Sequence, residues 1–274
     1  MTFHIITLFP RAFDSYLGES ILKRAIEDKK IKVKFYNPRD YTRDKRLRID
    51  RKPYGGGPGM VIQALPVIRA IESAFHFIKR HSYIPRNVGM SEKKRGKYLM
   101  PSAYRLVPKI IWLTPSGEQF TNETGVKYAK CSDLIIICGR YEGIDARVKR
   151  AIHARHPSSA PSPFPPEDGS ALGGKRGGKR WGGMPRIELE EVSVGPFVLT
   201  GGELPAMLMI DVISRQIPGV LGNEHSREET RVASPEVYTR PDVFSYRGKN
   251  YRVPKILLSG HHAQIDKWRK SKKG

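Results

Sequence analysis

Hydrophobic positions along the chain follow two alternating patterns. Segments typical of strands occur at 3–9, 32–37, 109–115 and 134–138, and the last two contain unbroken apolar runs, as in strands buried on both faces. Apolar residues at helical spacing lie over 13–30 and 66–78, and a short helical segment is predicted at 122–130. This alternation predicts an α/β fold in which helices cover a mostly parallel sheet.

Three glycine-containing segments are candidates for a binding site. The first is RKPYGGGPGM at 51–60, which has neither a following Lys-Ser/Thr nor the G-x-G-x-x-G spacing of the common phosphate loops. The second, GRYEGID, follows the apolar strand at 134–138, where open α/β sheets bind ligands; an ordinary strand exit explains it equally well. The third is TGGE at 200–203, between a strand predicted over 192–199 and a helix opened by Pro205.

The chain is strongly basic, with 49 Lys and Arg against 27 Asp and Glu and a net charge of +22. Much of the excess lies in two segments, because 76–109 holds nine basic residues against one Glu and 149–187 holds eight against two acids. Such a balance favours a polyanionic partner, most simply nucleic acid. Basic segments of this kind can also be merely solvated.

Two stretches interrupt the alternating pattern and look like insertions. Residues 155–186 are rich in Pro, Ser and Gly and then in Gly-Lys-Arg repeats, a composition too poor in apolar residues to order itself, which predicts a flexible basic loop. Its repeats could track a phosphate backbone while Trp181 stacks on a base, and a solvated linker is the alternative. Residues at about 80–107 form a second, milder insertion.

The remaining composition suggests a cytoplasmic protein. No apolar run reaches about 18 residues, so no membrane span is expected. The N-terminus lacks the basic region of a signal peptide and is predicted to be the first strand. Cys131 and Cys138 form neither a metal-binding pattern nor a disulfide framework.

Six motifs in a fixed order then identify a family. In chain order they are LFPRAF, PRDYTRDKRLRIDRKPYGGGPGM, ICGRYEGIDARV, VSVGPFVLTGGELPAMLMIDVISRQIPGVLGNE, YTRPDVF and VPKILLSGHHAQIDKWR. Together they resemble the bacterial tRNA (guanine-N1)-methyltransferases, the TrmD family of the SPOUT superfamily. The resemblance covers most of 1–75, 110–150 and 187–270. Any single glycine cluster would be a weak signal, whereas six ordered motifs are specific.

The resemblance implies a SPOUT-type fold with a deep trefoil knot, a feature so rare among folds that residue spacing could not have indicated it. It implies an obligate homodimer whose sites are each built from two chains. Residues 1–221 would form the methyltransferase domain, and 222–274 an interdomain segment and a small helical domain that binds tRNA. Relatives often continue with further helices, so that domain is expected to be shortened, with the basic insertions hypothesised to replace part of its surface.

The implied reaction is methyl transfer from S-adenosylmethionine to N1 of the guanine at tRNA position 37, next to the anticodon. The resemblance also implies magnesium as a possible requirement, because it is one in the family. No residue of this sequence is assigned as a metal ligand. Two alternatives remain: a SPOUT methyltransferase with another RNA target, such as a ribose 2′-hydroxyl, and an RNA-binding relative without catalysis.

The motifs also carry the family's site residues onto this chain. One catalytic group would be Arg215, which matches the arginine assigned to guanine O6. The S-adenosylmethionine site would be lined by Trp112, Leu113, Thr114, Pro115, Gly117, Gly139, Tyr141, Glu142, Gly143, Val194, Gly195, Pro196, Phe197, Val198, Leu199, Gly201 and Gly202. The substrate-binding residues would be Asp50, Tyr54, Gly55, Gly56, Gly57, Pro58 and Gly59.

Two departures from the family pattern affect this assignment. The family's general base is an Asp in a pattern close to S-x-x-E-D-S-F, but this chain reads SREETR at 226–231, one residue shorter and without the Asp. Glu229 is the best substitute and Glu228 the runner-up. The third donor loop has Gly195-Pro196-Phe197 where the family usually has Gly-Asp-Tyr, which removes a carboxylate near the cofactor.

Overall fold

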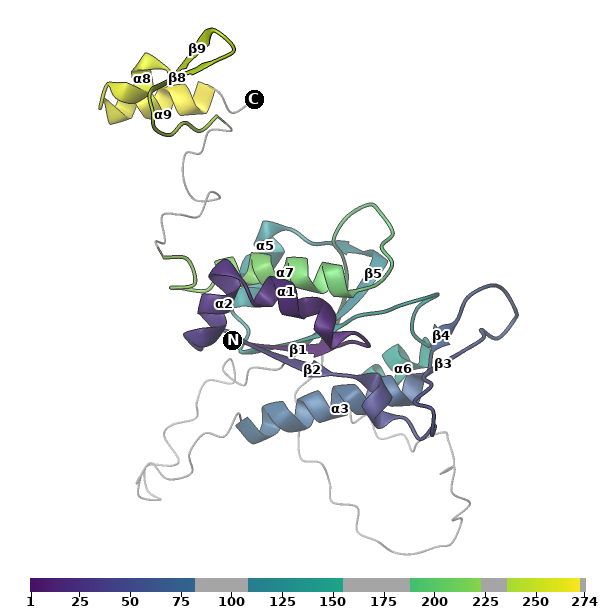
Figure 1. The fold of residues 1–274 in the computed structure, drawn as a ribbon. Coiled ribbons are helices and arrows are strands. Elements are labelled where there is room, and N and C mark those ends of the chain that lie inside the picture. Colours follow the sequence, from purple (N-terminus) through teal and green to yellow (C-terminus); the bar gives the residue numbers. More distant parts are fainter. Residues whose placement is uncertain (82–107, 155–187, 223–235, 272–274) are drawn as a thin grey trace, which may run out of the picture. The chain divides into compact units, whose positions relative to one another are not determined.

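The structure is a computed structural model that describes residues 1–81, 108–154, 188–222 and 236–271. The chain separates into two compact units, Met1–Val220 and Leu221–Gly274 (Figure 1). That the first is the methyltransferase domain and the second a tRNA-binding domain remains a prediction. Most of the two basic insertions lies outside the described residues.

A five-stranded sheet forms the centre of the first unit. Its order is β2-β1-β6-β5-β7, and every neighbouring pair is parallel. The strands are β1 (Thr2–Ile6), β2 (Lys32–Tyr36), β5 (Lys109–Gln119), β6 (Asp133–Ile137) and β7 (Leu189–Ser193). The expectation of an α/β fold with a mostly parallel sheet is therefore confirmed.

Helices cover both faces of this sheet (Figure 1). One face carries α1 (Asp14–Leu17), α2 (Ser20–Glu27), α5 (Asn122–Ala129) and α7 (Glu203–Arg215), and the other carries α3 (Ala64–His81) and α6 (Arg147–Ala154). Short 3₁₀ turns, η1 (Pro10–Phe13) and η2 (Pro38–Tyr41), follow β1 and β2.

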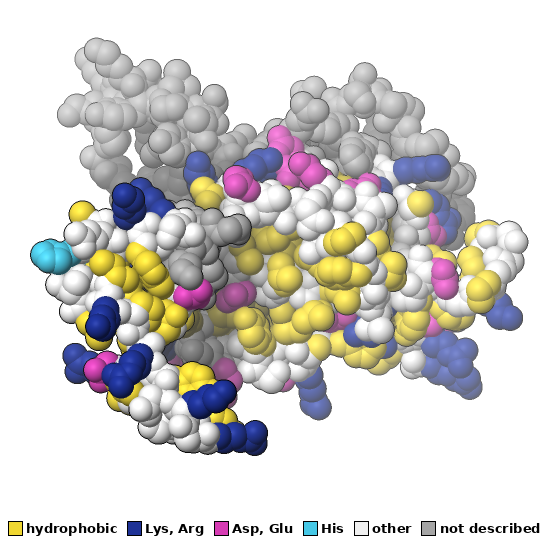
Figure 2. All heavy atoms as spheres, turned by 90° about the horizontal axis from the view of Figure 1, so that it is seen from above, with side chains coloured by type: hydrophobic (Ala, Val, Ile, Leu, Met, Phe, Trp, Pro, Cys, Tyr) yellow, Lys and Arg dark blue, Asp and Glu magenta, His cyan; other side chains and the backbone are white. Residues whose placement is uncertain are grey.

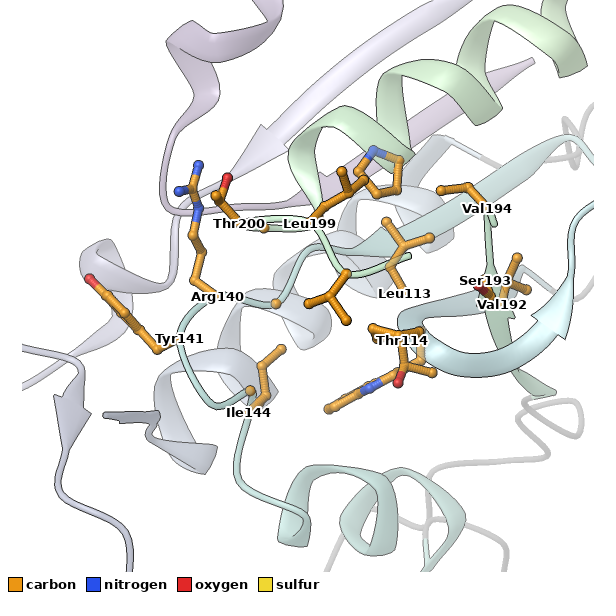
Figure 3. A pocket seen from close by; sticks show the side chains of 18 of the residues that line it. Leu113, Thr114, Arg140, Tyr141, Ile144, Val192, Ser193, Val194, Leu199 and Thr200 are labelled. Carbon is orange, nitrogen blue, oxygen red and sulfur yellow. The ribbon is translucent and has the colours of Figure 1, made fainter. Parts of the chain in front are cut away.

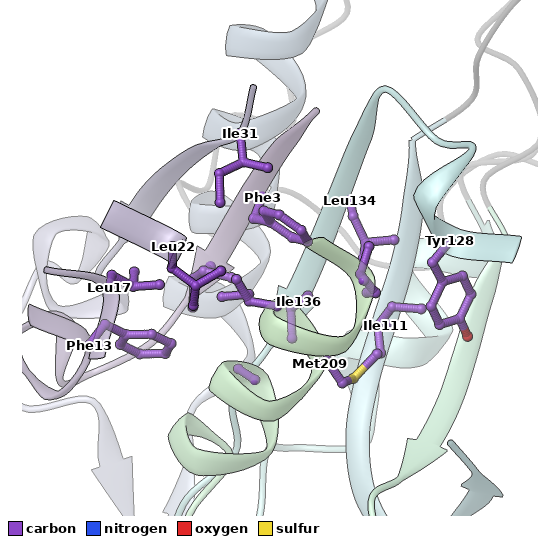
Figure 4. Close-up of a cluster of buried hydrophobic side chains, with 14 of the residues drawn as sticks. Phe3, Phe13, Leu17, Leu22, Ile31, Ile111, Tyr128, Leu134, Ile136 and Met209 are labelled. Atoms are coloured by element: carbon purple, nitrogen blue, oxygen red, sulfur yellow. The ribbon is translucent and has the colours of Figure 1, made fainter. Parts of the chain in front are cut away.

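The buried side chains sort into two clusters because successive strand residues point to opposite faces. Phe3, Ile111 and Leu134 pack on the α7 side with Met209 (Figure 4). Ile135 and Ile137 of β6 pack on the other side, with residues of α3. Burial on both faces explains why the strands at the centre of the sheet read as continuous apolar runs.

Two predicted elements differ in the structure, and one small hairpin was not predicted. The helix expected over 13–30 is divided into α1 and α2 at Gly18, where a Cβ would lie 2.7 Å from the Asp14 carbonyl oxygen. The strand expected over 192–199 was wrong beyond Ser193: β7 ends there, and turns containing Pro196, which has no N–H for a ladder, follow. The glycine-rich loop at 51–60 closes a small antiparallel hairpin, β3 (Asp50–Arg51) with β4 (Val61–Ile62).

The pairing of β5 with β7 is irregular at the point that matters most for the site. Val192 lies opposite both Leu113 and Glu118, so residues 114–117 leave the ladder and return to it. A Cβ at Gly117 would lie 2.5 Å from the backbone nitrogen of Val192, which explains why glycine occupies the return. The excursion projects a loop beyond the edge of the ladder.

The second unit contains a hairpin as well as helices. Its described elements are β8 (Val243–Tyr246), β9 (Lys249–Arg252), α8 (Lys255–Leu258) and α9 (His262–Ser271). The expectation of a small helical domain did not include this hairpin. Across the residues that the structure describes in both units, no helix combines the length and apolar character needed to cross a membrane.

Candidate functional site

A cavity of about 290 Å³ lies at the excursion of β5 and the carboxyl ends of β6 and β7 (Figure 3). Three loops form its walls: the excursion of β5, the segment after β6, and the turns between β7 and α7. It is lined by Trp112, Leu113, Thr114, Pro115, Gly139, Arg140, Tyr141, Glu142, Gly143, Ile144, Val192, Ser193, Val194, Phe197, Val198, Leu199, Thr200, Gly201, Gly202 and Pro205.

The structure thus brings together the residues expected at the donor site, with three exceptions. Gly117 lies in the return of β5 and supports the loop from behind. Gly195 and Pro196 lie in the third loop, where the ring of Phe197 occupies the space that a side chain at Gly195 would need. Arg140, Ile144 and Thr200 also line the cavity; the sequence placed them in candidate binding segments but did not assign them to the donor site.

The loop after β6 is held in a tight turn by backbone hydrogen bonds. The Gly143 N–H donates to the Arg140 carbonyl at 3.0 Å, and the Gly202 N–H donates to the Gly139 carbonyl at 2.9 Å. Gly143 has a φ of +117°, which only glycine adopts easily, and nothing lies within 4 Å of the Cβ it lacks. The second and third loops are therefore joined, with open space in front of Gly143.

The glycines of the cavity differ in what surrounds them. A Cβ at Gly202 would lie 2.6 Å from the Cα of Cys138, so α7 can begin here only if the residue is glycine. At Gly139 the nearest atom to an added Cβ is 3.9 Å away, on Ile144, so this position has room for a side chain. Burial raises the pKa of the Cys138 thiol well above its ordinary value, so this thiol stays protonated and is poorly nucleophilic.

A buried carboxylate ties the loop after β6 to the start of α7. Glu203 is 3% exposed; its Oε2 accepts from Nε of Arg140 at 3.0 Å, and its Oε1 accepts from the Thr7 hydroxyl at 2.8 Å. The Arg140 guanidinium also lies 4.5 Å from the centre of the Phe9 ring. Since a Cβ at Gly201 would meet Arg140 Nε at 2.5 Å, this glycine leaves space for the ion pair.

Removal of the Glu203 carboxylate is expected to be costly. Glu203→Ala should lower the free energy of unfolding by about 2–4 kcal/mol, because the half-buried Arg140 loses its charged partner. Thr7→Val, which removes one neutral hydrogen bond, should cost only about 1 kcal/mol. Urea unfolding of the three proteins measures both values, and equal losses for the two variants would contradict a dominant ion pair.

The loop at 51–60, which is expected to bind the substrate, lies against the loop after β6. The Glu142 N–H donates to the Met60 carbonyl at 3.1 Å, and Ile62 N–H donates to the Gly143 carbonyl at 3.0 Å. A Cβ at Gly59 would lie 2.3 Å from Oε1 of Glu142, so the two loops are packed closely. Tyr54 at the tip of the loop is fully exposed. Positive φ values between +81° and +110° occur at all four glycines of the loop, Gly55, Gly56, Gly57 and Gly59, with Pro58 before the last. At the base of the loop, Asp50 pairs with Ile62.

The expected catalytic residues do not join this cavity within the described residues of one chain. Arg215 is the last residue of α7, the helix whose first turn adjoins the cavity. Burial raises the pKa of Asp211, one helical turn before it, and the charge of Arg215 opposes that rise. Glu228 and Glu229 lie outside the described residues. Nor do the described side chains include a group of three or more His, Cys, Asp or Glu that could hold a metal ion.

Comparison with known proteins gives one consistent result. The family model described as tRNA (Guanine-1)-methyltransferase TrmD matches residues 1–158 and 184–274. A tRNA (guanine-N(1)-)-methyltransferase of Caldanaerobacter subterraneus is 37% identical, covering 99% of this chain and 86% of the relative. Its counterpart from Lachnospira eligens is 38% identical over 99% and 89%, and that from Clostridioides difficile is 36% identical over 98% and 91%.

Proposed function

The chain belongs to the tRNA (guanine-1)-methyltransferase TrmD family, and from this premise we propose that it methylates N1 of the guanine at position 37 of tRNA. The observation that carries the proposal is the cavity at the β5 excursion and the ends of β6 and β7, which gathers the expected donor residues beside the glycine-rich loop at 51–60. A donor and an acceptor base could therefore be held next to each other. The basic composition suits a tRNA partner in the cytoplasm.

The methyl donor is S-adenosylmethionine, and the cavity has features that fit it. Apolar side chains such as Leu113, Ile144 and Leu199 can sandwich a flat adenine. Gly139 and Gly143 leave the space of a missing side chain where the cofactor needs close backbone approach. The carboxylate of Glu142 and the hydroxyl of Thr114 are available for polar groups. When bound, the sulfonium supplies an activated methyl group; the chain's own part is to position it.

The acceptor atom requires two further groups from the protein. Guanine N1 carries a proton at neutral pH, so a base must remove it; the carboxylate of Glu229 is assigned this role, with Glu228 as runner-up. Negative charge then develops on guanine O6, and the permanently charged guanidinium of Arg215 suits its stabilisation. This scheme needs no covalent nucleophile, and no metal ligand is assigned among the described residues.

The position of Arg215 supports a site built from two chains. It lies twelve residues after Glu203, so the helix places it about 18 Å from the end of α7 that adjoins the cavity. An arginine side chain cannot span that distance to a base held beside the donor. We therefore assign Arg215 to the cavity of a second chain in a homodimer.

An exposed apolar face also supports the homodimer. Figure 2, seen from the side of α7, displays hydrophobic side chains gathered on one face of the first unit. The helices on this side of the sheet carry exposed apolar residues, Tyr16 of α1 and Leu204 and Leu208 of α7, with exposures of 47%, 58% and 41%. A contiguous apolar face of this kind favours association with another copy.

The trefoil knot is also part of the proposal. Val192 of β7 lies opposite two separated residues of β5, so the β5 excursion begins and ends beside the place where the chain leaves β7. The close approach of Gly117 to Val192 and of Gly202 to Cys138 gives the tight backbone crossings that a knotted arrangement needs.

Methyl acceptance by altered tRNA transcripts tests the function. The protein should transfer labelled methyl from S-adenosylmethionine to a transcript with guanine at position 37, and replacement of that guanine by adenine should abolish transfer. Equal labelling of both transcripts would place the target elsewhere. The absent Asp suggests one other candidate, a non-catalytic RNA-binding relative, which would bind tRNA without transferring methyl. Calorimetric titration with S-adenosylmethionine shows whether the chain binds the donor at all.

A further inference from the structure

The hairpin of the second unit exposes three aromatic rings on one face. In the register of β8 and β9, Phe244 lies opposite Tyr251 and Tyr246 opposite Lys249, so these four side chains share a face. Phe244, Tyr246 and Tyr251 are 54%, 56% and 47% exposed. The opposite face carries a hydrogen bond between Ser245 and Asn250. Exposed rings confined to one face of a short hairpin call for a ligand or partner.

The rings are already arranged as a platform. Phe244 and Tyr251 are stacked, with ring centres 5.2 Å apart and planes inclined by 14°. The guanidinium of Arg247 lies 5.3 Å from the centre of the Tyr246 ring and extends the flat surface toward the turn. The turn itself has positive φ at both central residues, +47° at Arg247 and +73° at Gly248, as in the tight hairpin turns that match strand twist. Little ordering would be needed on binding.

The charges around this platform select the partner. Between Arg240 and Lys255 there are five basic residues and a single acid, Asp242. A polyanion is therefore attracted, whereas a second copy of this basic unit would be repelled. Single-stranded nucleic acid is bound by aromatic rings that lie beside cationic side chains. The cations neutralise its phosphates, and every base offers a flat face for stacking on the rings.

We propose that this hairpin face binds unpaired nucleotides of the tRNA substrate by stacking bases on Phe244, Tyr246 and Tyr251. Lys249, which lies on the same face, would neutralise an adjacent phosphate. The inference rests on the proposed function for the identity of the RNA, and it adds a base-stacking contact remote in sequence from the donor cavity. It concerns binding and leaves the chemical step unchanged.

Paired substitutions in the full chain separate stacking from simple apolar contact. The double variant Phe244→Leu, Tyr251→Leu keeps apolar side chains suited to a strand but removes both ring faces, and it should bind tRNA about tenfold more weakly. Its control, Phe244→Tyr with Tyr251→Phe, keeps both rings and should bind as the wild type does. Lys249→Ala should instead reduce the slope of affinity against salt by about one. Fluorescence anisotropy at several salt concentrations measures all of these.

Ultraviolet cross-linking gives a readout that does not depend on how the variants fold. Wild-type protein irradiated with tRNA should yield cross-linked peptides from 243–252. Cross-links found only elsewhere, or wild-type affinity in the leucine variant, would overturn the inference. If the wild type still methylated tRNA, the proposed function would stand. A leucine variant that sediments as a smaller species would show that the face contacts protein and would also overturn it. A wild type that neither binds nor methylates tRNA would defeat the proposed function itself.

Discussion

Glu229→Gln should reduce single-turnover methyl transfer by about 10²–10⁴-fold, the usual contribution of a positioned general base. The substitution keeps the size of the side chain and removes its basicity, so donor affinity should change little. The physical need for this group is fixed by the acceptor: the guanine N1 lone pair becomes available only as its proton leaves. A Glu in a segment one residue shorter than the family pattern has an additional methylene with which to reach that proton.

Glu228→Gln is the matched control, because it changes the same chemical group one residue away. It should cost far less than Glu229→Gln in the same rapid-quench assay. A reversal of the two effects would mean that the gap in the segment lies one residue from where we place it. Normal methylation by both variants would exclude a carboxylate base in 226–231, and the proton would then leave to another group or to water.

Mixed dimers should reveal which chain supplies Arg215. Arg215→Ala should lose about 10²–10³-fold in transfer rate, the typical effect of removing one donor to a developing oxyanion. Gly139→Val should block the donor cavity without unfolding the chain, because the space beside Gly139 accepts a side chain. If Arg215 serves the partner's cavity, a dimer of one Arg215→Ala chain and one Gly139→Val chain has one intact site.

Co-expression with two different affinity tags isolates that mixed dimer. Each variant alone should be inactive, and the mixed dimer should recover up to half of the wild-type activity. No recovery would mean that Arg215 and the cavity it serves belong to the same chain, against the separation of about 18 Å along α7. Gly201→Val is unsuitable for this purpose, because its side chain would collide with the Arg140–Glu203 pair.

Sequence periodicity predicted the elements whose burial is simple. The strand at 134–138 and the helix at 66–78 correspond to β6 and α3, because a strand covered on both faces must be apolar throughout and a covering helix must be apolar on one side. The strand prediction for the stretch at 192–199 was wrong because apolar residues also occur outside strands. Its apolar residues beyond Ser193 line a cavity, and apolar lining residues cannot be distinguished from strand residues by period alone.

The candidate site was predictable as a set of segments and less so as a geometry. Ordered motifs pointed to the three loops, but no pattern indicated that Glu203 would be buried between Arg140 and Thr7, which are far apart in sequence. The contact of Gly59 with Glu142 likewise depends on how two loops meet in space. The remoteness of Arg215 from the cavity becomes apparent only once α7 is known to run unbroken between them.

The most direct measurement is the identity of the methylated atom. The protein should be incubated with S-adenosylmethionine and a tRNA transcript that has guanine at position 37, and the product digested and analysed by mass spectrometry of nucleosides and of position-mapped fragments. The account predicts a single new product, 1-methylguanosine at position 37. A methyl group on a ribose 2′-hydroxyl, or on any atom other than guanine N1, would contradict it.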